Sequence, residues 1–201
     1  PFTASHLSTV AWSPNGAKFV STARDDYLRI WNGETGAVQG FIKVREFDGK
    51  NSGGGRSNAA WSPDGSKLVW KGAVGELWIL DGDTAEILDR WNYSSNSDLY
   101  WPLTRVAWSP DGTRIASGHA YGELRIWDAA TGSILWRKES TIDSQSRDER
   151  GAWESSENLF KWGSSRFGVA WNAASSRVVV AGGPDSTLRI FDTASKSLVR
   201  T

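Results

Sequence analysis

The chain of 201 residues carries no net charge, because 23 acidic side chains balance its 23 basic ones. A neutral chain lacks the basic surface that displaces counterions from nucleic acid, so we expect no general DNA or RNA partner, although a local basic patch is compatible with this balance. Cysteine is absent, which excludes disulfides, thiol nucleophiles and thiolate metal sites. No stretch approaches the roughly 20 apolar residues that cross a bilayer, and no signal-peptide or lipidation pattern is visible. We therefore expect no membrane partner; the compartment is left open, with the cytoplasm as the working expectation.

The first predicted unit, residues 1–50, contains four short apolar or aromatic runs. Runs rich in β-branched and aromatic residues favour β-strands. They are residues 10–12, 19–20, 28–31 and 38–44. The segment Ser13-Pro14-Asn15-Gly16 separates the first two as a tight turn, because proline presets φ and glycine tolerates the remaining conformations. The unit therefore predicts four antiparallel strands in a meander.

This pattern returns three times in chain order, in units that span residues 51–100, 101–165 and 166–201. The first strand with its turn recurs as residues 59–65 and 106–112 and, in degenerate form, as 169–174. The third strand recurs as residues 77–81, 124–128 and 188–192. The tryptophan of the first strand and the large residue of the third are 19 residues apart in three units and 20 apart in the fourth. Four copies with nearly fixed spacing indicate one repeated structural unit within a single region, residues 1–201.

The repeated Trp-Ser-Pro-Asp-Gly and Leu-Arg-Ile-Trp-Asp motifs resemble the WD40 repeat family over nearly the whole chain. The resemblance implies an all-β fold, a β-propeller of four-stranded antiparallel blades. A sheet of this kind cannot bury both faces alone, and radial stacking against similar sheets covers them. We expect structural roles in the strands for Trp12, Trp31, Trp61, Trp108, Trp127 and Trp171.

The family often stiffens each blade with a hydrogen-bonded tetrad that includes an aspartate in the turn between the second and third strands. Asp25 and Asp185 occupy that place in the first and fourth units, whereas Val74 and Tyr121 replace it in the others. The one candidate for the tetrad histidine, His6, is closer to its strand than the family pattern requires. We expect blades that are held mainly by apolar packing.

The number of blades is a second departure from the family, which usually closes its ring with about seven. Four such blades cover little more than half a ring. Three arrangements follow: the remaining blades lie outside this chain, two chains pair into an eight-bladed ring, or four blades close tightly alone. We expect a partial ring or half of an oligomeric ring. The chain begins at Pro1 and has no methionine, which favours a piece of a longer polypeptide, or a processed or engineered chain.

Long connections between the units suggest where a partner binds. They are roughly residues 45–58, 92–103 and 139–166, and in a propeller of this family they all emerge on one face. Loops on a rigid scaffold usually carry recognition, and aromatic side chains are good interface anchors. The candidate contacts to other proteins or peptides are Asp98, Tyr100, Trp101, Tyr121, Trp153 and Phe160. The alternative is that aromatic residues of these loops, Trp162 above all, fold back and cover the ring centre or a blade edge.

An enzyme needs converging acids, bases or metal ligands, and the chain offers few. Its two histidines are His6 and His119, and we interpret His119 as a polar residue at a strand end. Neither a metal-binding histidine pattern, a phosphate-binding loop nor a nucleophile motif is found in the sequence. We expect no cofactor, no metal and no catalysis. The sequence favours a protein–protein interaction scaffold. One alternative is a sensor domain of a larger nucleotide-hydrolysing signalling or defence protein, and a less favoured one is a propeller enzyme.

Overall fold

The computed structural model describes nine parts of the chain: residues 7–23, 25, 27–43, 58–71, 76–92, 103–119, 123–138, 168–182 and 187–201. These parts contain sixteen strands and no helix. Accordingly, none of the described residues forms a helix that could cross a membrane. The strands make four separate four-stranded sheets, in each of which consecutive strands pair antiparallel. The prediction of an all-β chain of four antiparallel meanders is confirmed.

The sheets follow one another along the chain. The first contains β1 (Leu7–Trp12), β2 (Lys18–Ala23), β3 (Tyr27–Asn32) and β4 (Val38–Lys43). The second contains β5 (Ala59–Trp61), β6 (Lys67–Lys71), β7 (Glu76–Asp81) and β8 (Ile87–Asn92). The third contains β9 (Leu103–Trp108), β10 (Arg114–His119), β11 (Leu124–Asp128) and β12 (Ile134–Lys138). The fourth contains β13 (Gly168–Trp171), β14 (Arg177–Ala181), β15 (Leu188–Asp192) and β16 (Ser197–Arg200).

Two recurring turns join the strands. In the second sheet, Ser62 Oγ donates to Asp64 Oδ1 over 2.6 Å and accepts the amide of Lys67, which closes the turn between the first two strands. Gly65 follows with a φ of +73°, a conformation that glycine adopts without strain. Before the fourth strand, Asp81 Oδ1 accepts the amides of Asp83 and Thr84. The Oδ1 atoms of Asn32, Asp128 and Asp192 accept similar hydrogen bonds from backbone amides, which close the same turn in the other sheets.

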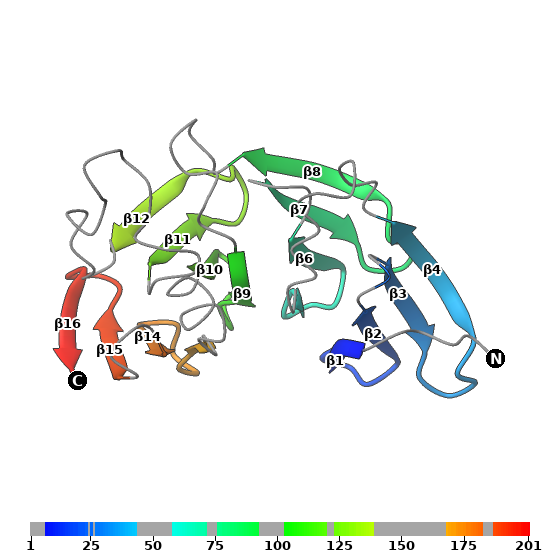
Figure 1. The fold of residues 1–201 in the computed structure, drawn as a ribbon, viewed down its shortest axis with the longest axis horizontal. Coiled ribbons are helices and arrows are strands. Elements are labelled where there is room, and N and C mark those ends of the chain that lie inside the picture. The colour runs from blue at the N-terminus through cyan, green and yellow to red at the C-terminus, as the bar shows by residue number, and fades with distance from the viewer. Residues whose placement is uncertain are drawn as a thin grey trace, which may run out of the picture.

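The four sheets stand side by side in an arc (Figure 1). Their first strands contact one another in sequence, β1 with β5, β5 with β9 and β9 with β13. The fourth strands, β4, β8, β12 and β16, follow the outer rim (Figure 1). The first and last sheets stand at opposite ends of the arc and do not meet, so the ring is open. The prediction of a partial ring is therefore confirmed, and four blades do not close alone.

Three apolar clusters fill the spaces between neighbouring sheets, which we call the seams. Each seam uses the same face of the earlier sheet: Leu28, Leu77 and Leu124 occupy equivalent positions in β3, β7 and β11 and are at most 1% exposed. Fully burying one such side chain contributes about 1.5–3 kcal/mol. The repeat of one apolar position thus holds each sheet against the next.

Candidate functional site

Tryptophan side chains tie sheets together at two of the three seams. Trp61 of β5 donates from Nε1 to the carbonyl oxygen of Ala11 in β1 over 3.1 Å. Trp171 of β13 makes the same bond, also 3.1 Å, to the carbonyl of Ala107 in β9. Both bonds join the first strand of one sheet to the first strand of the sheet before it. The tryptophan of the Trp-Ser-Pro motif is therefore a seam residue.

A cation at the start of the second strand strengthens the same two seams. The Lys18 Nζ lies 5.6 Å from the centre of the Trp61 ring and donates to the carbonyl of Gly82 over 2.9 Å and to Asp83. In the third sheet, the Arg114 guanidinium lies 5.1 Å from the ring of Trp171. It also donates to the Ser175 carbonyl over 2.6 Å and to Thr193 Oγ1 over 2.9 Å. Each cation thus packs on the next sheet's tryptophan and reaches that sheet's turns.

The seam between the second and third sheets uses other groups. The side-chain amide of Asn58 accepts from the Val106 amide over 2.7 Å and donates to the Val106 carbonyl over 3.2 Å. Nearer the rim, the rings of Trp91 and Trp127 stack with centres 6.2 Å apart. Trp108, the equivalent of Trp61, finds no acceptor for its Nε1 among the described residues.

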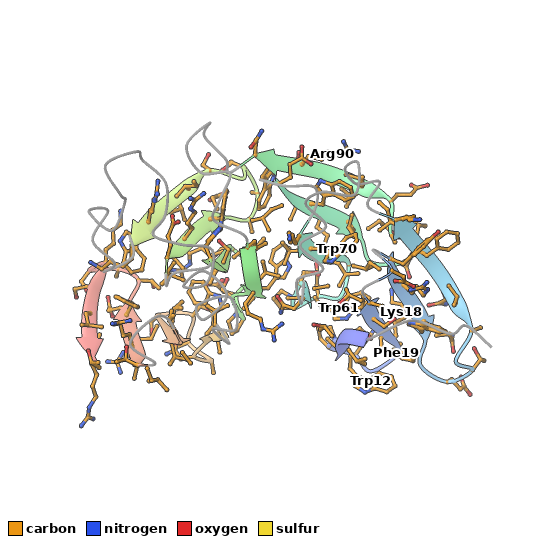
Figure 2. The ribbon with its side chains drawn as sticks, in the orientation of Figure 1. Trp12, Lys18, Phe19, Trp61, Trp70 and Arg90 are labelled. Carbon is orange, nitrogen blue, oxygen red and sulfur yellow. The ribbon has the colours of Figure 1, made fainter. Side chains whose placement is uncertain are left out.

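The outer surface of the first sheet, which we call the first end face, carries a row of aromatic side chains. Trp12 is 57% exposed and Phe41 is 63% exposed. The ring of Phe19 lies between Trp12 and Trp31, with centres 5.3 Å and 5.7 Å away. Figure 2 shows Trp12 and Phe19 at the end of the arc, whereas Trp61 lies between the first two sheets. Val10, 57% exposed, completes this apolar surface.

The outer surface of the fourth sheet, the last end face, is aliphatic. Leu188 is 52% exposed, Ala170 and Ala181 are exposed, and Val179 and Ile190 are partly exposed. All five lie on the opposite side of the sheet from Val178, Val180 and Phe191, which pack against the third sheet. The fourth sheet therefore exposes apolar side chains on the face that it does not bury against the third sheet.

Ion pairs lie where the third strands of the first and third sheets begin. The Asp25 carboxylate accepts two hydrogen bonds from the Arg29 guanidinium, over 2.6 and 3.3 Å. Burial alone would raise the pKa of Asp25, but the hydrogen bonds from Arg29 and Tyr27 hold it below its ordinary value. In the third sheet, Glu123 Oε1 lies 2.6 Å from the Nε of Arg125 and 2.6 Å from the Nε of Arg137. The side chains of Glu123 and Arg125 are each only 1% exposed. Arg29 and Arg125, which stand at equivalent positions of their third strands, are thus both paired with acids.

His119 belongs to a buried hydrogen-bonded chain in the third sheet. Trp127 Nε1 donates to Ser117 Oγ over 2.8 Å, and Ser117 Oγ lies 2.9 Å from Nε2 of the fully buried His119. The first sheet keeps part of this chain, because Trp31 Nε1 donates to Ser21 Oγ over 2.8 Å. Sequence reasoning missed this serine, although the two serines stand at the same place in their repeats, ten residues before the tryptophan. The arrangement ties the second strand to the third and is structural.

The other perturbed carboxylates are turn acceptors. Hydrogen bonds from Ser62 and Ser66 lower the pKa of Asp64 to about 2. Burial would raise the pKa of Asp111, but bonds from Ser109 and Thr113 bring it well below its usual range. Backbone amides of the following turn, with the hydroxyl of Thr131 or Ser195, likewise lower the pKa of Asp128 and Asp192. Among the described residues, no three histidine or acidic side chains gather where they could hold a metal ion.

The partner-binding candidates from the sequence, and the long connections that hold most of them, fall in the gaps between described parts. Asp98, Tyr100, Trp101, Tyr121, Trp153 and Phe160 lie outside the described residues. Asp185, expected in a turn, also lies outside them, whereas Asp25 is found in a turn. The six tryptophans assigned to strands, Trp12, Trp31, Trp61, Trp108, Trp127 and Trp171, all lie in strands. The exposed apolar side chains of the two end faces are a feature that the sequence analysis did not name residue by residue.

Comparison with known proteins gives a family similarity for part of the chain and a fold for all of it. Residues 2–32 and 96–128 match the WD40 family model, described as WD domain, G-beta repeat. The structure of U3-55K is 16% identical and superposes with a TM-score of 0.67, covering 99% of this chain and 52% of the other. The crystal structure of the mitotic checkpoint complex gives 15% identity and a TM-score of 0.68, covering 100% of this chain and 52% of the other. The chain thus spans about half the length of these solved chains, and no curated protein matches it. Residues 2–32 and 96–128 are thus similar to WD40 repeats, and the four sheets share the fold of these solved structures as an open β-propeller.

Proposed function

We propose that this chain is a non-catalytic scaffold that binds other proteins or peptides. The observation that carries the proposal is the arc itself, in which apolar seams lock four sheets into one body that holds their edges and connections in place. Loops on such a scaffold are the usual sites of recognition. The similar fold found in the mitotic checkpoint complex, a multiprotein assembly by its name, supports this role.

The strand directions support one face as the binding face. In each sheet the first strand begins, and the fourth strand ends, at the same edge, because neighbouring strands are antiparallel. The connections between sheets leave after Lys43, Asn92 and Lys138. They therefore attach at that edge, together with the turn that holds Asp25. We propose that partners bind there, through the candidates Asp98, Tyr100, Trp101, Tyr121, Trp153 and Phe160.

The described polar groups support binding rather than chemistry. Asp64, Asp81 and Asp111 accept hydrogen bonds within their own turns. Asp25 and Glu123 are paired with arginines. A general acid or base must reach a substrate with a proton to exchange, whereas these carboxylates are already occupied in holding the backbone.

Selection of displayed peptides tests the proposed binding face. Peptides shown on phage are selected on the immobilised chain, and the affinity of a selected peptide is measured by fluorescence polarisation. We expect Tyr100→Ala and Trp153→Ala each to weaken binding by about tenfold or more, as truncation of an aromatic anchor commonly does.

The matched control is Leu88→Ala, because Leu88 is 52% exposed on the rim strand β8, away from the connections. Its peptide affinity should equal that of the unmodified chain. A selected peptide that is lost on Leu88→Ala and retained by both loop variants would place the binding site on the rim and overturn the proposed face.

A further inference from the structure

The last end face repeats the surface that the first three sheets bury in their seams. Val179 of β14 is equivalent to Val20, Val69 and Ala116, which are 0% exposed. Leu188 and Ile190 of β15 are likewise equivalent to the pairs Leu28 and Ile30, Leu77 and Ile79, and Leu124 and Ile126. Those six residues are at most 3% exposed, but Leu188 is 52% exposed. The fourth sheet therefore presents one half of a seam.

The first end face presents the other half. Trp12 is equivalent to Trp61 and Trp171, whose Nε1 atoms bind the carbonyls of Ala11 and Ala107 in the sheet before. Trp61 is 7% exposed, whereas Trp12 is 57% exposed. Phe19 is equivalent to Leu68, Ile115 and Val178, all 0% exposed in their seams. The first sheet thus carries the side of a seam that normally meets a preceding sheet.

We propose that two copies of this chain associate head to tail, so that the last end face of each copy covers the first end face of the other. As at the first and third internal seams, Trp12 Nε1 donates to the Ala170 carbonyl of the second copy, since Ala170 is equivalent to Ala11 and Ala107. Val179, Leu188 and Ile190 pack against Trp12, Phe19 and Trp31 of the second copy. The association buries both apolar ends of the arc in two identical seams.

Polar groups at the ends of the arc fit the same pairing. Arg177 begins β14 at the position that Lys18 and Arg114 hold in their sheets, and those cations stack on the tryptophan of the next sheet. Lys18 also reaches Gly82 and Asp83, whose equivalents in the first sheet are Gly33 and Glu34. Arg177 is exposed and can stack on Trp12 and approach the Glu34 carboxylate of the second copy. The charges at this seam are therefore complementary.

The shape of the arc favours a second copy as the occupant. A contact between two different surfaces of the same molecule gives a closed ring when the rotation between copies closes, and a fibre when it does not. Four sheets follow an open arc with its two ends apart (Figure 1). Two arcs related by a twofold axis close into eight sheets.

Light scattering of the purified chain over a range of concentrations tests the association. We expect a mass of twice 22.1 kDa. Trp12→Ala and Leu188→Asp should each raise the concentration for half-dissociation by at least about tenfold, because truncation of buried interface anchors costs that much or more. Leu88→Asp is the matched control, since Leu88 is as exposed as Leu188 but lies outside both end faces, and it should stay dimeric. Circular dichroism and thermal melting confirm that each variant is folded.

Mixing two variants separates head-to-tail pairing from other dimers. Trp12→Ala leaves the last end face intact, and Leu188→Asp leaves the first end face intact, so one copy of each can form one unmodified seam. An equimolar mixture should therefore contain dimers at concentrations where each variant alone is monomeric. A monomeric unmodified chain, a dimer insensitive to both substitutions, a mixture that stays monomeric, or open-ended polymers would each overturn the proposal.

Discussion

Single aspartates and asparagines close the turns of this chain by collecting several hydrogen bonds at one side-chain oxygen. Asp64 Oδ1 accepts from two serine hydroxyls and one amide, and Asn15 accepts from Ser13 and Ala17 at the equivalent place. The amide oxygen of asparagine can therefore accept the hydrogen bonds that close this turn, as the aspartate carboxylate does. The difference between the two residues is that only the aspartate titrates.

This difference predicts a pH dependence. The unfolded chain binds a proton at Asp64 near the usual pKa of 3.8, whereas the folded chain binds it only near 2. Stability from this group is thus present above pH 3.8 and is lost as the pH falls towards 2. Because the carboxylate is exposed to solvent, we expect about 1 kcal/mol rather than the full value of the shift. Urea unfolding at a series of pH values should show that the Asp64→Asn variant loses less unfolding free energy between pH 3.8 and pH 2 than the unmodified chain does.

The reverse substitution is the control, since Asn15→Asp should make the acid loss steeper by a similar amount. Equal acid slopes for the two variants and the unmodified chain would contradict this role of the turn aspartate.

Residue-scale features differ in how far the sequence predicts them. The Ser13-Pro14-Asn15-Gly16 turn was predicted because its chemistry is local. The sequence analysis missed Ser21 and Ser117 as the acceptors of the third-strand tryptophans. A signal was present, because the second and fourth sheets lack both the third-strand tryptophan and the serine, and have Trp70 and Val180 at the serine position. The Glu123–Arg125 pair was missed because burial decides its geometry, and alternating charges on a strand do not reveal burial.

At the scale of elements, the seams depend on close approach between a turn and a neighbouring ring. Gly132 has a φ of +71°, and a Cβ placed on it would lie 2.5 Å from the Trp91 ring. Gly36 occupies the equivalent turn of the first sheet with a φ of +66° and has open space around it. Ala85 and Lys196 hold the same backbone conformation in the other two sheets. The backbone of this turn thus tolerates a side chain. In the third sheet, the nearby Trp91 ring leaves no room for one at position 132.

Gly132→Ala should therefore cost more than Gly36→Ala. Both variants carry the strain of a side chain in the left-handed region, about 1 kcal/mol. Gly132→Ala also pushes against Trp91, which stacks on Trp127 across the seam, and overpacking of this kind adds about 1–3 kcal/mol. Chemical denaturation followed by tryptophan fluorescence measures both free energies of unfolding. Equal losses of unfolding free energy in the two variants would show that contact with the Trp91 ring does not restrict the side chain at position 132.

The repeat in the sequence predicted the boundaries of the elements, but it did not predict the contacts between them. The fixed spacing between first and third strands predicted four sheets, because the repeat period and the turn residues can be read from short segments of the sequence. The bond from Trp61 to Ala11 joins residues 50 positions apart, and nothing in either motif marks the pair. Only the stacking of equivalent sheets brings a tryptophan to the main chain of its neighbour.

At the scale of the whole molecule, the arc has two kinds of sheet. The second and third sheets are covered on both faces, whereas the first and fourth have one seam and one end face each. In repeat proteins, stability is approximately a sum of intrinsic terms and nearest-neighbour interfaces. An arc that stands alone should therefore open more readily at its ends than at its centre. The sequence predicted the open arc from the blade count, but it did not show that the two ends carry complementary halves of a seam.

Amide hydrogen exchange measures this gradient directly. In Trp12→Ala, the variant expected to be monomeric, amides of β6, β7, β10 and β11 should exchange more slowly than those of β2, β3, β14 and β15. Local opening of an end sheet breaks one seam, whereas opening of a central sheet breaks two. In the unmodified chain at concentrations where it is dimeric, association covers both end faces, so the protection of the end sheets should rise towards that of the central ones. Protection that is uniform in the variant would mean that the four sheets unfold as one unit, and that the seams couple the sheets more strongly than a sum over nearest neighbours allows.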